Sequence, residues 1–111
     1  MRITIVALLA AAFSTAAAAQ SLSGEQIRNA LIGHTISGVE DGEAYSEHLN
    51  ADGTISGRSP SGDYSGRWRI TRDEICFRYD DDEDWDCNEV SLRGNKITWD
   101  DGSSAALSEE R

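Results

Sequence analysis

The chain has 111 residues, 20 of them acidic and 10 basic, and its formal net charge at pH 7 is −10. This length allows one small domain with a limited core, and the negative charge makes nucleic acid and anionic membrane surfaces poor partners. A cationic protein is a better electrostatic match, although solubility alone would also explain the composition.

The beginning of the chain has the pattern of a secretory signal peptide. A positive start at Arg2 precedes an apolar run over 3–13, and an A-x-A cleavage motif occupies 17–19. The apolar run is too short for a comfortable membrane span. We therefore expect residues 1–19 to be removed and residues 20–111 to form a single domain in a bacterial periplasm. That domain carries 9 basic and 20 acidic residues, a net charge of −11, because Arg2 is the only charged residue of the leader.

The segment from Leu22 to Gly33 predicts one short helix. Ser23 is a candidate N-cap, Gln26 can complete a capping box, and Leu22 can pack against Ile27. Gly33 can end the helix in the left-handed conformation. A helix this short needs a packing partner, since isolated short helices are marginal in water.

After Gly33 the chain alternates between polar and apolar residues in short runs separated by Gly, Asp and Asn. This pattern is typical of an antiparallel meander, and no connection is long enough for a crossover helix. We expect a mainly β, lipocalin-like fold of about eight strands, either a barrel or a strongly curled sheet, with the helix at one end or side. No internal repeat is expected. The expected strands are Thr35–Val39, Ala44–Leu49, Thr54–Arg58, Tyr64–Ile70, Glu74–Tyr79, Trp85–Leu92, Lys96–Trp99 and Ala105–Leu107.

The alternation also predicts a register for two of these strands. Trp68 and Ile70 share one face of their strand. A four-residue turn over 71–74 would place Ile70 opposite Ile75 and Trp68 opposite Phe77. Both pairs join apolar side chains, so this register is self-consistent.

The two cysteines, Cys76 and Cys87, are most simply one disulfide, because an even pair in a small exported domain meets an oxidising compartment. A loop over 80–83 would place them directly opposite each other. Such a bond would stabilise the fold by roughly 3 kcal/mol. Two free thiols or a metal pair are the alternatives.

The same register makes two further predictions. Arg78 would lie opposite Trp85, where a guanidinium can stack on an indole. Asp86 would lie opposite Phe77 on the inner face, either at a solvated rim or next to a bulge that shifts the parity.

Residues 80–86 contain six acids in seven positions. Asp80, Asp82 and Asp84 match the first ligand positions of a calcium loop, but Trp85 stands where that loop needs glycine. The run is therefore a solvated hairpin tip, a weak calcium site or a docking patch for a basic partner. The candidate docking residues are Asp80, Asp81, Asp82, Glu83 and Asp84.

A second candidate contact region is the loop over 59–66, which contains the only proline. Loops displayed on a rigid barrel often carry binding contacts, although this one also suits a merely permissive connection. Its candidate binding residues are Ser59, Ser61, Gly62, Asp63 and Tyr64.

The sequence shows no convincing catalytic or metal site. Ser46 and His48 would lie about 6–7 Å apart on one strand face, too far for a triad with Asp52. His34 and His48 lack a third ligand for a metal, and no glycine-rich phosphate loop is present. We therefore expect a protein that is not an enzyme and that has no cofactor and no metal.

Four features follow one another in the chain: an aspartate-glycine hairpin at Asp52-Gly53-Thr54, a Y-x-G-x-W strand at 64–68, a C-F-x-Y strand at 76–79 and a second cysteine at Cys87. This order resembles small secreted bacterial β-proteins of unassigned function. The resemblance covers about residues 33–100 and implies a fold rather than an activity.

A weaker resemblance is to periplasmic inhibitors of c-type lysozyme, which are small disulfide-bearing β-barrels with an S-G-x-x-Y loop. Ser61-Gly62-Asp63-Tyr64 is similar and one residue shorter. The resemblance implies binding to a peptidoglycan-cleaving muramidase, a class of enzyme that is often strongly basic.

The sequence thus predicts a periplasmic acidic protein that docks on a cationic partner, with inhibition of a muramidase as the most specific version. The alternatives are a lipocalin-like carrier of a small apolar ligand and a structural component of the cell envelope. Bulky residues expected to point inward argue against a carrier, because they could fill so small a barrel. They are Tyr45, Trp68, Ile70, Phe77, Trp99 and Leu107.

Overall fold

The computed structural model describes residues 20–108, and the predicted signal peptide lies outside them. The described residues form one short helix and nine antiparallel strands, which confirms the mainly β fold. In chain order the elements are α1 (Gly24–Leu31), β1 (Thr35–Glu40), β2 (Glu43–Leu49), β3 (Thr54–Ser59), β4 (Gly62–Thr71), β5 (Glu74–Tyr79), β6 (Asp86–Asn88), β7 (Val90–Arg93), β8 (Lys96–Trp99) and β9 (Ser104–Ser108).

Helix α1 begins and ends where the sequence signals predict. The Ser23 hydroxyl accepts a hydrogen bond of 3.2 Å from the Gln26 backbone N–H, and the Gln26 side chain accepts one of 2.8 Å from the Ser23 N–H. This capping box satisfies amides that the helix itself leaves unpaired. Gly33 follows the helix with a φ of 86°. Ile27 and Leu31 are fully buried, so α1 is held by its apolar side.

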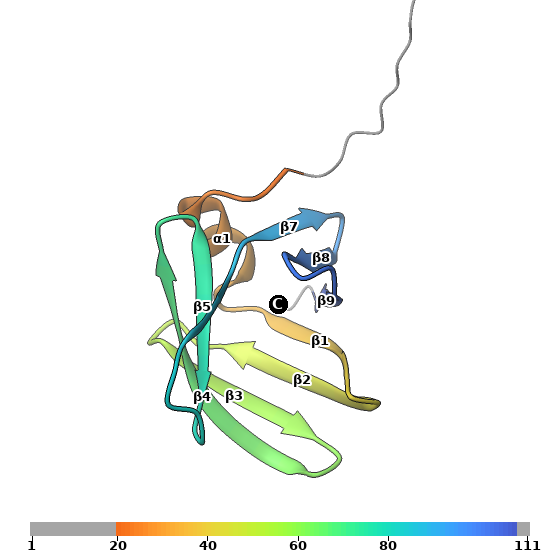
Figure 1. Cartoon of the computed structure of the whole chain (residues 1–111). Coiled ribbons are helices and arrows are strands. Elements are labelled where there is room, and N and C mark those ends of the chain that lie inside the picture. Colours follow the sequence, from red (N-terminus) through yellow and green to blue (C-terminus); the bar gives the residue numbers. More distant parts are fainter. Residues whose placement is uncertain (1–19, 109–111) are drawn as a thin grey trace, which may run out of the picture.

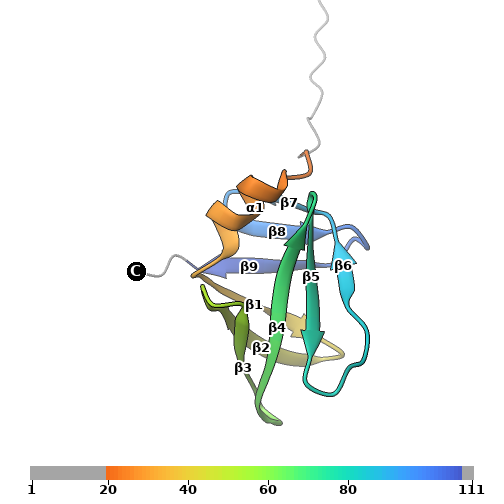
Figure 2. The same ribbon diagram turned by 90° about the vertical axis from the view of Figure 1, so that its left-hand side faces the viewer.

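The strands form one curled sheet whose two edges approach each other. Their spatial order is β6-β5-β4-β3-β2-β1-β9-β8-β7, and the edge strands β6 and β7 are separated in the chain only by Glu89. Figures 1 and 2 show α1 at one end of this nearly closed barrel, beside the β4–β5 turn, with the β3–β4 turn at the other end. The Leu22 N–H donates to the Val90 carbonyl at 2.8 Å and ties the segment before α1 to the edge strand β7.

The predicted register between β4 and β5 is confirmed. Trp68 pairs with Phe77 and Ile70 pairs with Ile75 across the turn. Trp68, Phe77 and Ile75 are buried. The alternation of apolar residues is therefore sufficient to align this hairpin, because a shift by one residue would expose all of them.

The disulfide is also confirmed. Cys76 and Cys87 are bonded and lie directly opposite each other in the β5–β6 ladder. Strand β6 has only three residues, so the covalent bond fixes a short strand at the edge of the sheet.

Trp85 lies just before β6 on the outer face, against two guanidinium groups. The Cζ atoms of Arg69 and Arg78 are 4.2 Å and 5.2 Å from the centroid of its ring. The predicted contact of Arg78 is confirmed, and Arg69 supplies a second, closer one. Asp86 pairs with Phe77 and is exposed, so it occupies the solvated rim that was one of its two predicted positions.

The single strand expected over 85–92 is wrong, because the chain forms two strands there. Asn88 pairs with Ile75 on one edge of the sheet, whereas Val90 pairs with Trp99 on the other. The Glu89 N–H between them donates to the Asp100 carboxylate at 3.0 Å. A strand that closes a curled sheet must change partner at the seam, and the alternation of side chains does not reveal where.

The apolar core occupies the helix end of the barrel. Trp68 and Phe77 are buried in it, whereas Tyr45, Ile70, Trp99 and Leu107 are only partly buried against it. The expectation that bulky inward residues fill the interior is therefore wrong for the opposite end, which is open. The buried apolar side chains are Ile27, Leu31, Ile36, Leu49, Ile55, Trp68, Ile75, Phe77, Val90, Ile97 and Ala105.

Candidate binding site at the open end of the barrel

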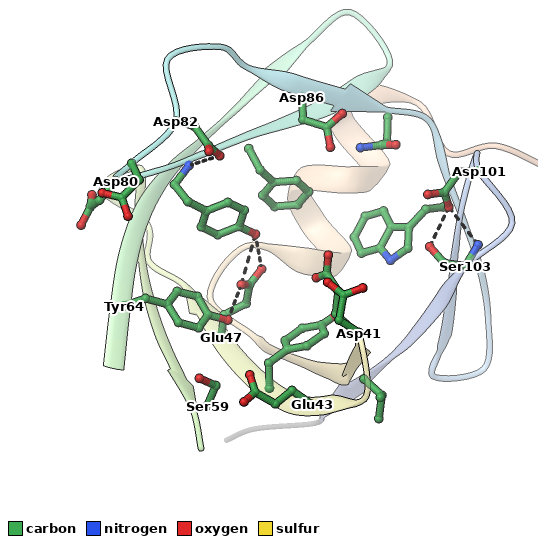
Figure 3. Close-up of a pocket in the computed structure, with 18 of the residues that line it drawn as sticks. Asp41, Glu43, Glu47, Ser59, Tyr64, Asp80, Asp82, Asp86, Asp101 and Ser103 are labelled. Atoms are coloured by element: carbon green, nitrogen blue, oxygen red, sulfur yellow. Dashed lines mark hydrogen bonds between the residues drawn. The ribbon is translucent and has the colours of Figure 1, made fainter. Parts of the chain in front are cut away.

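The end of the barrel away from α1 holds an open cavity of about 840 Å³, which we call the acidic mouth. Figure 3 looks into it, with the helix behind the side chains that line it. Carboxylates and aromatic rings dominate the lining, and the described residues there include no lysine, arginine or histidine. The acidic lining residues are Glu40, Asp41, Glu43, Glu47, Asp80, Asp81, Asp82, Asp86 and Asp101, and the aromatic ones are Tyr45, Tyr64, Phe77, Tyr79 and Trp99.

Three tyrosines shape the wall of the mouth, and each one lies opposite a glycine on the neighbouring strand. A Cβ atom added to Gly57 would stand 2.1 Å from Cε1 of Tyr64, and one added to Gly66 would stand 2.9 Å from Cδ1 of Tyr79. The rings therefore lie on the inner face of the barrel, packed across the glycine backbone. This arrangement keeps the centre of the mouth open. The three pairs are Tyr45 with Gly38, Tyr64 with Gly57 and Tyr79 with Gly66.

Glu47 on β2 lies at the floor of the mouth, and its residue is only 6% exposed. The Tyr64 hydroxyl donates to its Oε1 at 2.9 Å. The Tyr79 hydroxyl donates to Oε2 at 2.9 Å and to Oε1 at 3.2 Å. Figure 3 shows the Tyr64 phenol directed at Glu47. Glycine at position 57 makes the contact possible, because Gly57 lies between Glu47 and Tyr64 in the sheet.

The titration of these groups reflects burial among like charges. Burial raises the pKa of Glu47, the hydrogen bonds from Tyr64 and Tyr79 lower it in part, and the charge of Glu40 raises it further. Burial, followed by the charges of Glu47 and Glu40, raises the pKa of Tyr45 to about 12. Burial and the Glu47 charge also raise the pKa of Tyr64 and of Tyr79. The three phenols are therefore protonated at neutral pH.

Aromatic rings form the wall beside this carboxylate. Phe77 meets Trp99 edge to face with centroids 5.7 Å apart, and it stacks on Tyr79 at 6.3 Å. Tyr64 meets Tyr79 edge to face at 5.8 Å. Such faces attract organic cations through their quadrupoles. Eight further carboxylates line the same cavity, and a concave surface of one sign concentrates the potential felt by an approaching cation.

The predicted contact loop over 59–66 is much shorter than expected. Strand β3 continues to Ser59 and β4 begins at Gly62, so only Pro60 and Ser61 form the turn. The prediction of a long loop is wrong, because the hydrogen-bonded ladder of β3 and β4 extends almost to the tip of the hairpin. Ser59 and Tyr64 line the acidic mouth.

The other predicted residues of that hairpin lie outside the mouth lining. Ser61 donates to the Glu43 carboxylate at 2.8 Å, and Gly62 adopts a φ of 131° at the start of β4. Asp63 pairs with Arg58 and lines a second groove with it.

The predicted acidic tip divides in the same way. Asp80, Asp81 and Asp82 line the mouth, whereas Glu83 and Asp84 are exposed and do not. The Ser65 hydroxyl donates to the Asp80 carboxylate. For the calcium interpretation, residues 20–108 contain no group of three or more His, Cys, Asp or Glu side chains placed to hold a metal ion.

The histidines lie elsewhere. His48 Nδ1 is 2.9 Å from the Thr35 hydroxyl, and His34 Nδ1 is 3.3 Å from the Ile32 carbonyl. Asp52 accepts hydrogen bonds from the Thr54 N–H at 3.0 Å and the Thr54 hydroxyl at 2.6 Å. His48, the candidate base, and Asp52, the candidate orienting acid, therefore have other hydrogen-bond partners.

Sequence reasoning missed Glu47, the most buried acid of the site, and it also missed a short repeat that positions two of the tyrosines. Thr-Ile-Ser-Gly occurs at 35–38 and again at 54–57, and each copy is followed at the same spacing by Tyr-Ser, at 45–46 and 64–65. The expectation of no internal repeat is therefore wrong. Each copy is a hairpin that places a tyrosine over a glycine.

In the described part of the chain, no helix is long and apolar enough to cross a membrane. A scan against protein-family models gave no match, and searches of curated proteins and of solved structures found no similar chain.

Proposed function

We propose that this protein is an exported, acidic binding protein that docks on a cationic partner and receives basic groups in the acidic mouth. The observation that carries the proposal is the lining of that cavity, which combines carboxylates with aromatic faces and contains no described basic residue. A neutral or anionic ligand would leave these charges uncompensated, whereas a cation would neutralise them. The disulfide is compatible with export to an oxidising compartment.

The partner that we propose first is a strongly basic peptidoglycan hydrolase, such as a muramidase of the lysozyme class, inhibited by the docked protein. Charge complementarity supports this choice, since opposite potentials accelerate encounter and select partners. The contacts would come from Ser59, Tyr64 and the rim of the mouth rather than from a projecting loop. We define the rim as the exposed acids of the lining, which are Glu40, Asp41, Glu43, Asp80, Asp81, Asp82, Asp86 and Asp101.

A small-ligand carrier is the second candidate, and the volume of the mouth favours it. About 840 Å³ lies within the range of cavities that hold small molecules. The lining changes the expected ligand, however. Burying an apolar molecule against Glu47 and the rim acids would be unfavourable, so a carrier with this site would bind an organic cation.

The test is direct binding of a purified c-type lysozyme to the purified, disulfide-bonded protein. We expect the Kd to weaken by roughly tenfold when salt rises from about 0.05 to about 0.5 M, because rim charges are screened at that ionic strength. Inhibition of the muramidase activity should weaken in parallel. Binding that is indifferent to salt would overturn electrostatic docking.

Two charge-matched variants locate the surface. Asp81→Asn with Asp86→Asn removes two charges from the rim, and Glu25→Gln with Glu74→Gln removes two charges at the helix end. The rim variant should weaken binding several-fold more than its control. Equal effects would show that net charge alone attracts the partner. If the protein binds polylysine but not lysozyme, the proposal of a cationic partner stands and the proposal of a muramidase as that partner is rejected.

A further inference from the structure

The floor of the acidic mouth is chemically different from its rim. In residues 20–108, Glu47 is the only polar or charged residue that is buried. The Tyr64 and Tyr79 hydroxyls each direct their single proton at this carboxylate. A phenol that donates its proton retains its oxygen lone pairs as acceptors. The floor therefore presents acceptors to the cavity: a carboxylate and two phenolic oxygens.

We propose that Glu47, Tyr64 and Tyr79 form a seat for one primary ammonium group that enters through the mouth. An ammonium has three N–H donors, which match one carboxylate and two phenolic oxygens. The aromatic faces of Phe77 and Trp99 would contact the alkyl stem behind it. This inference rests on the proposed function, because it assumes that a cation enters the mouth.

The hydrogen bonds already present select against other cations. A guanidinium binds a carboxylate best as a planar fork, with one N–H on each oxygen. Here each oxygen of Glu47 already accepts from a phenol, Oε1 from Tyr64 and Oε2 from Tyr79, whose single proton is shared with Oε1 over a longer contact. An ammonium needs only one free carboxylate position. Divalent metals are disfavoured for a different reason, since the described residues offer no cluster of three metal-binding side chains.

Rim and floor then have separable roles. The rim acids act over a distance and are exposed, so salt screens them. Glu47 acts at contact and is shielded from salt. The ammonium can belong to a lysine side chain of a protein partner or to a free small amine, and both sources would use the same seat.

The experiment measures binding of four probes to the purified, disulfide-bonded protein by NMR titration at neutral pH. The probes are n-butylammonium, n-butylguanidinium, n-butanol and the lysine analogue Nα-acetyl-lysine methylamide. We expect n-butylammonium to bind roughly tenfold more tightly than n-butylguanidinium, and n-butanol not to bind. Tighter binding of the lysine analogue than of n-butylammonium would identify a protein lysine as the source, and the reverse order a small amine.

Two variants test the seat independently. Glu47→Gln should weaken the binding of n-butylammonium by about tenfold or more, since it removes the negative charge and keeps the shape of the side chain. Tyr79→Phe keeps the ring and removes one hydrogen-bond acceptor, so it should weaken n-butylammonium binding several-fold. Glu83→Gln, an acid outside the mouth lining, is the control and should leave binding within about twofold. Unfolding midpoints of all variants establish that each is folded.

Equal affinity for ammonium and guanidinium, or unchanged binding by Glu47→Gln, would overturn the seat. In that case salt-dependent binding of a cationic protein to the rim could still hold, so the proposed function would survive. Conversely, selective ammonium binding without any bound cationic protein would keep the seat and reject protein docking.

Discussion

Tyr64 lies flat over Gly57, its partner in the β3–β4 ladder. The absence of a Cβ atom at this position lets the phenol reach across β3 to Glu47, two strands away. Glycine in a strand normally weakens it. Here the aromatic ring covers the exposed backbone, so one cross-strand pair both protects the strand and builds the site.

Replacing Gly57 should therefore disturb the site through Tyr64. Gly57→Ala would place a Cβ atom 2.1 Å from the ring, and the ring must move away from Glu47. We expect a loss of roughly 1–3 kcal/mol in the free energy of unfolding, as for other overpacked positions. Urea unfolding followed by fluorescence measures it.

A double-mutant cycle supplies the control for this prediction. In a Tyr64→Ala background the ring is absent, and Gly57→Ala should cost much less. The same loss in both backgrounds would mean that the conformation of Gly57, and not its contact with Tyr64, determines the cost.

Glu47→Gln should stabilise the free protein at neutral pH, because it removes a charge that burial disfavours. The folded-state pKa of Glu47 is raised above the ordinary value of 4.5, so the folded state binds its proton more tightly than the unfolded state does. Wild-type stability from this group is thus fully present below that value and is lost as pH rises through the folded-state pKa.

The measurement is the difference in unfolding free energy between the two proteins at several pH values. It should be small in acid and grow as the pH rises above 4.5. A difference that is constant with pH would show that Glu47 is not the titrating group. Together with the loss of ammonium binding, a gain in stability would identify Glu47 as a functional residue retained at a structural cost.

The disulfide should be a major contributor to stability. The cysteines are separated by 11 positions, and removing a bond that closes so short a loop costs roughly 3 kcal/mol by loop-closure entropy. Urea unfolding of Cys76→Ala with Cys87→Ala should show this loss. Reductant should lower the stability of the wild type and leave the variant unchanged. A variant as stable as the oxidised wild type would contradict the prediction.

The contact of Arg69 with Trp85 should contribute less. Its Cζ atom lies 4.2 Å from the ring centroid on an exposed face, where cation–π pairs are worth about 0.5–1 kcal/mol. We expect Arg69→Gln to destabilise by this amount and to shift the Trp85 fluorescence. Arg67→Gln, on the same face of β4, should change the stability by less than half as much. Equal effects would point to net charge instead of stacking.

Much of the fold follows from local patterns. Ser23 and Gln26 begin the helix, Gly33 ends it, and the alternation around Trp68 and Phe77 aligns a hairpin and thereby pairs the cysteines. These features are readable because each depends on residues close in the chain. The seam at Glu89 is different, since it marks where the chain leaves β5 and joins β8.

The site is only partly readable from the sequence. Ser59, Tyr64 and Asp80–Asp82 were expected to bind and do line the mouth. Their surroundings were misjudged, because a projecting loop was expected where the structure has a tight hairpin with Tyr64 facing inward.

The helix, the class of fold, the pairing of the cysteines and the excess of negative charge all follow from the amino-acid sequence alone. Which acid of residues 20–108 is buried depends on the tertiary structure. Nothing around Glu47 in the chain distinguishes it, since its phenol partners come from β4 and β5 and the glycines beneath their rings from β3 and β4. Burial and the hydrogen bonds of a carboxylate depend on what the curled sheet brings around it, and that is a property of strand order and curvature rather than of neighbours in the chain.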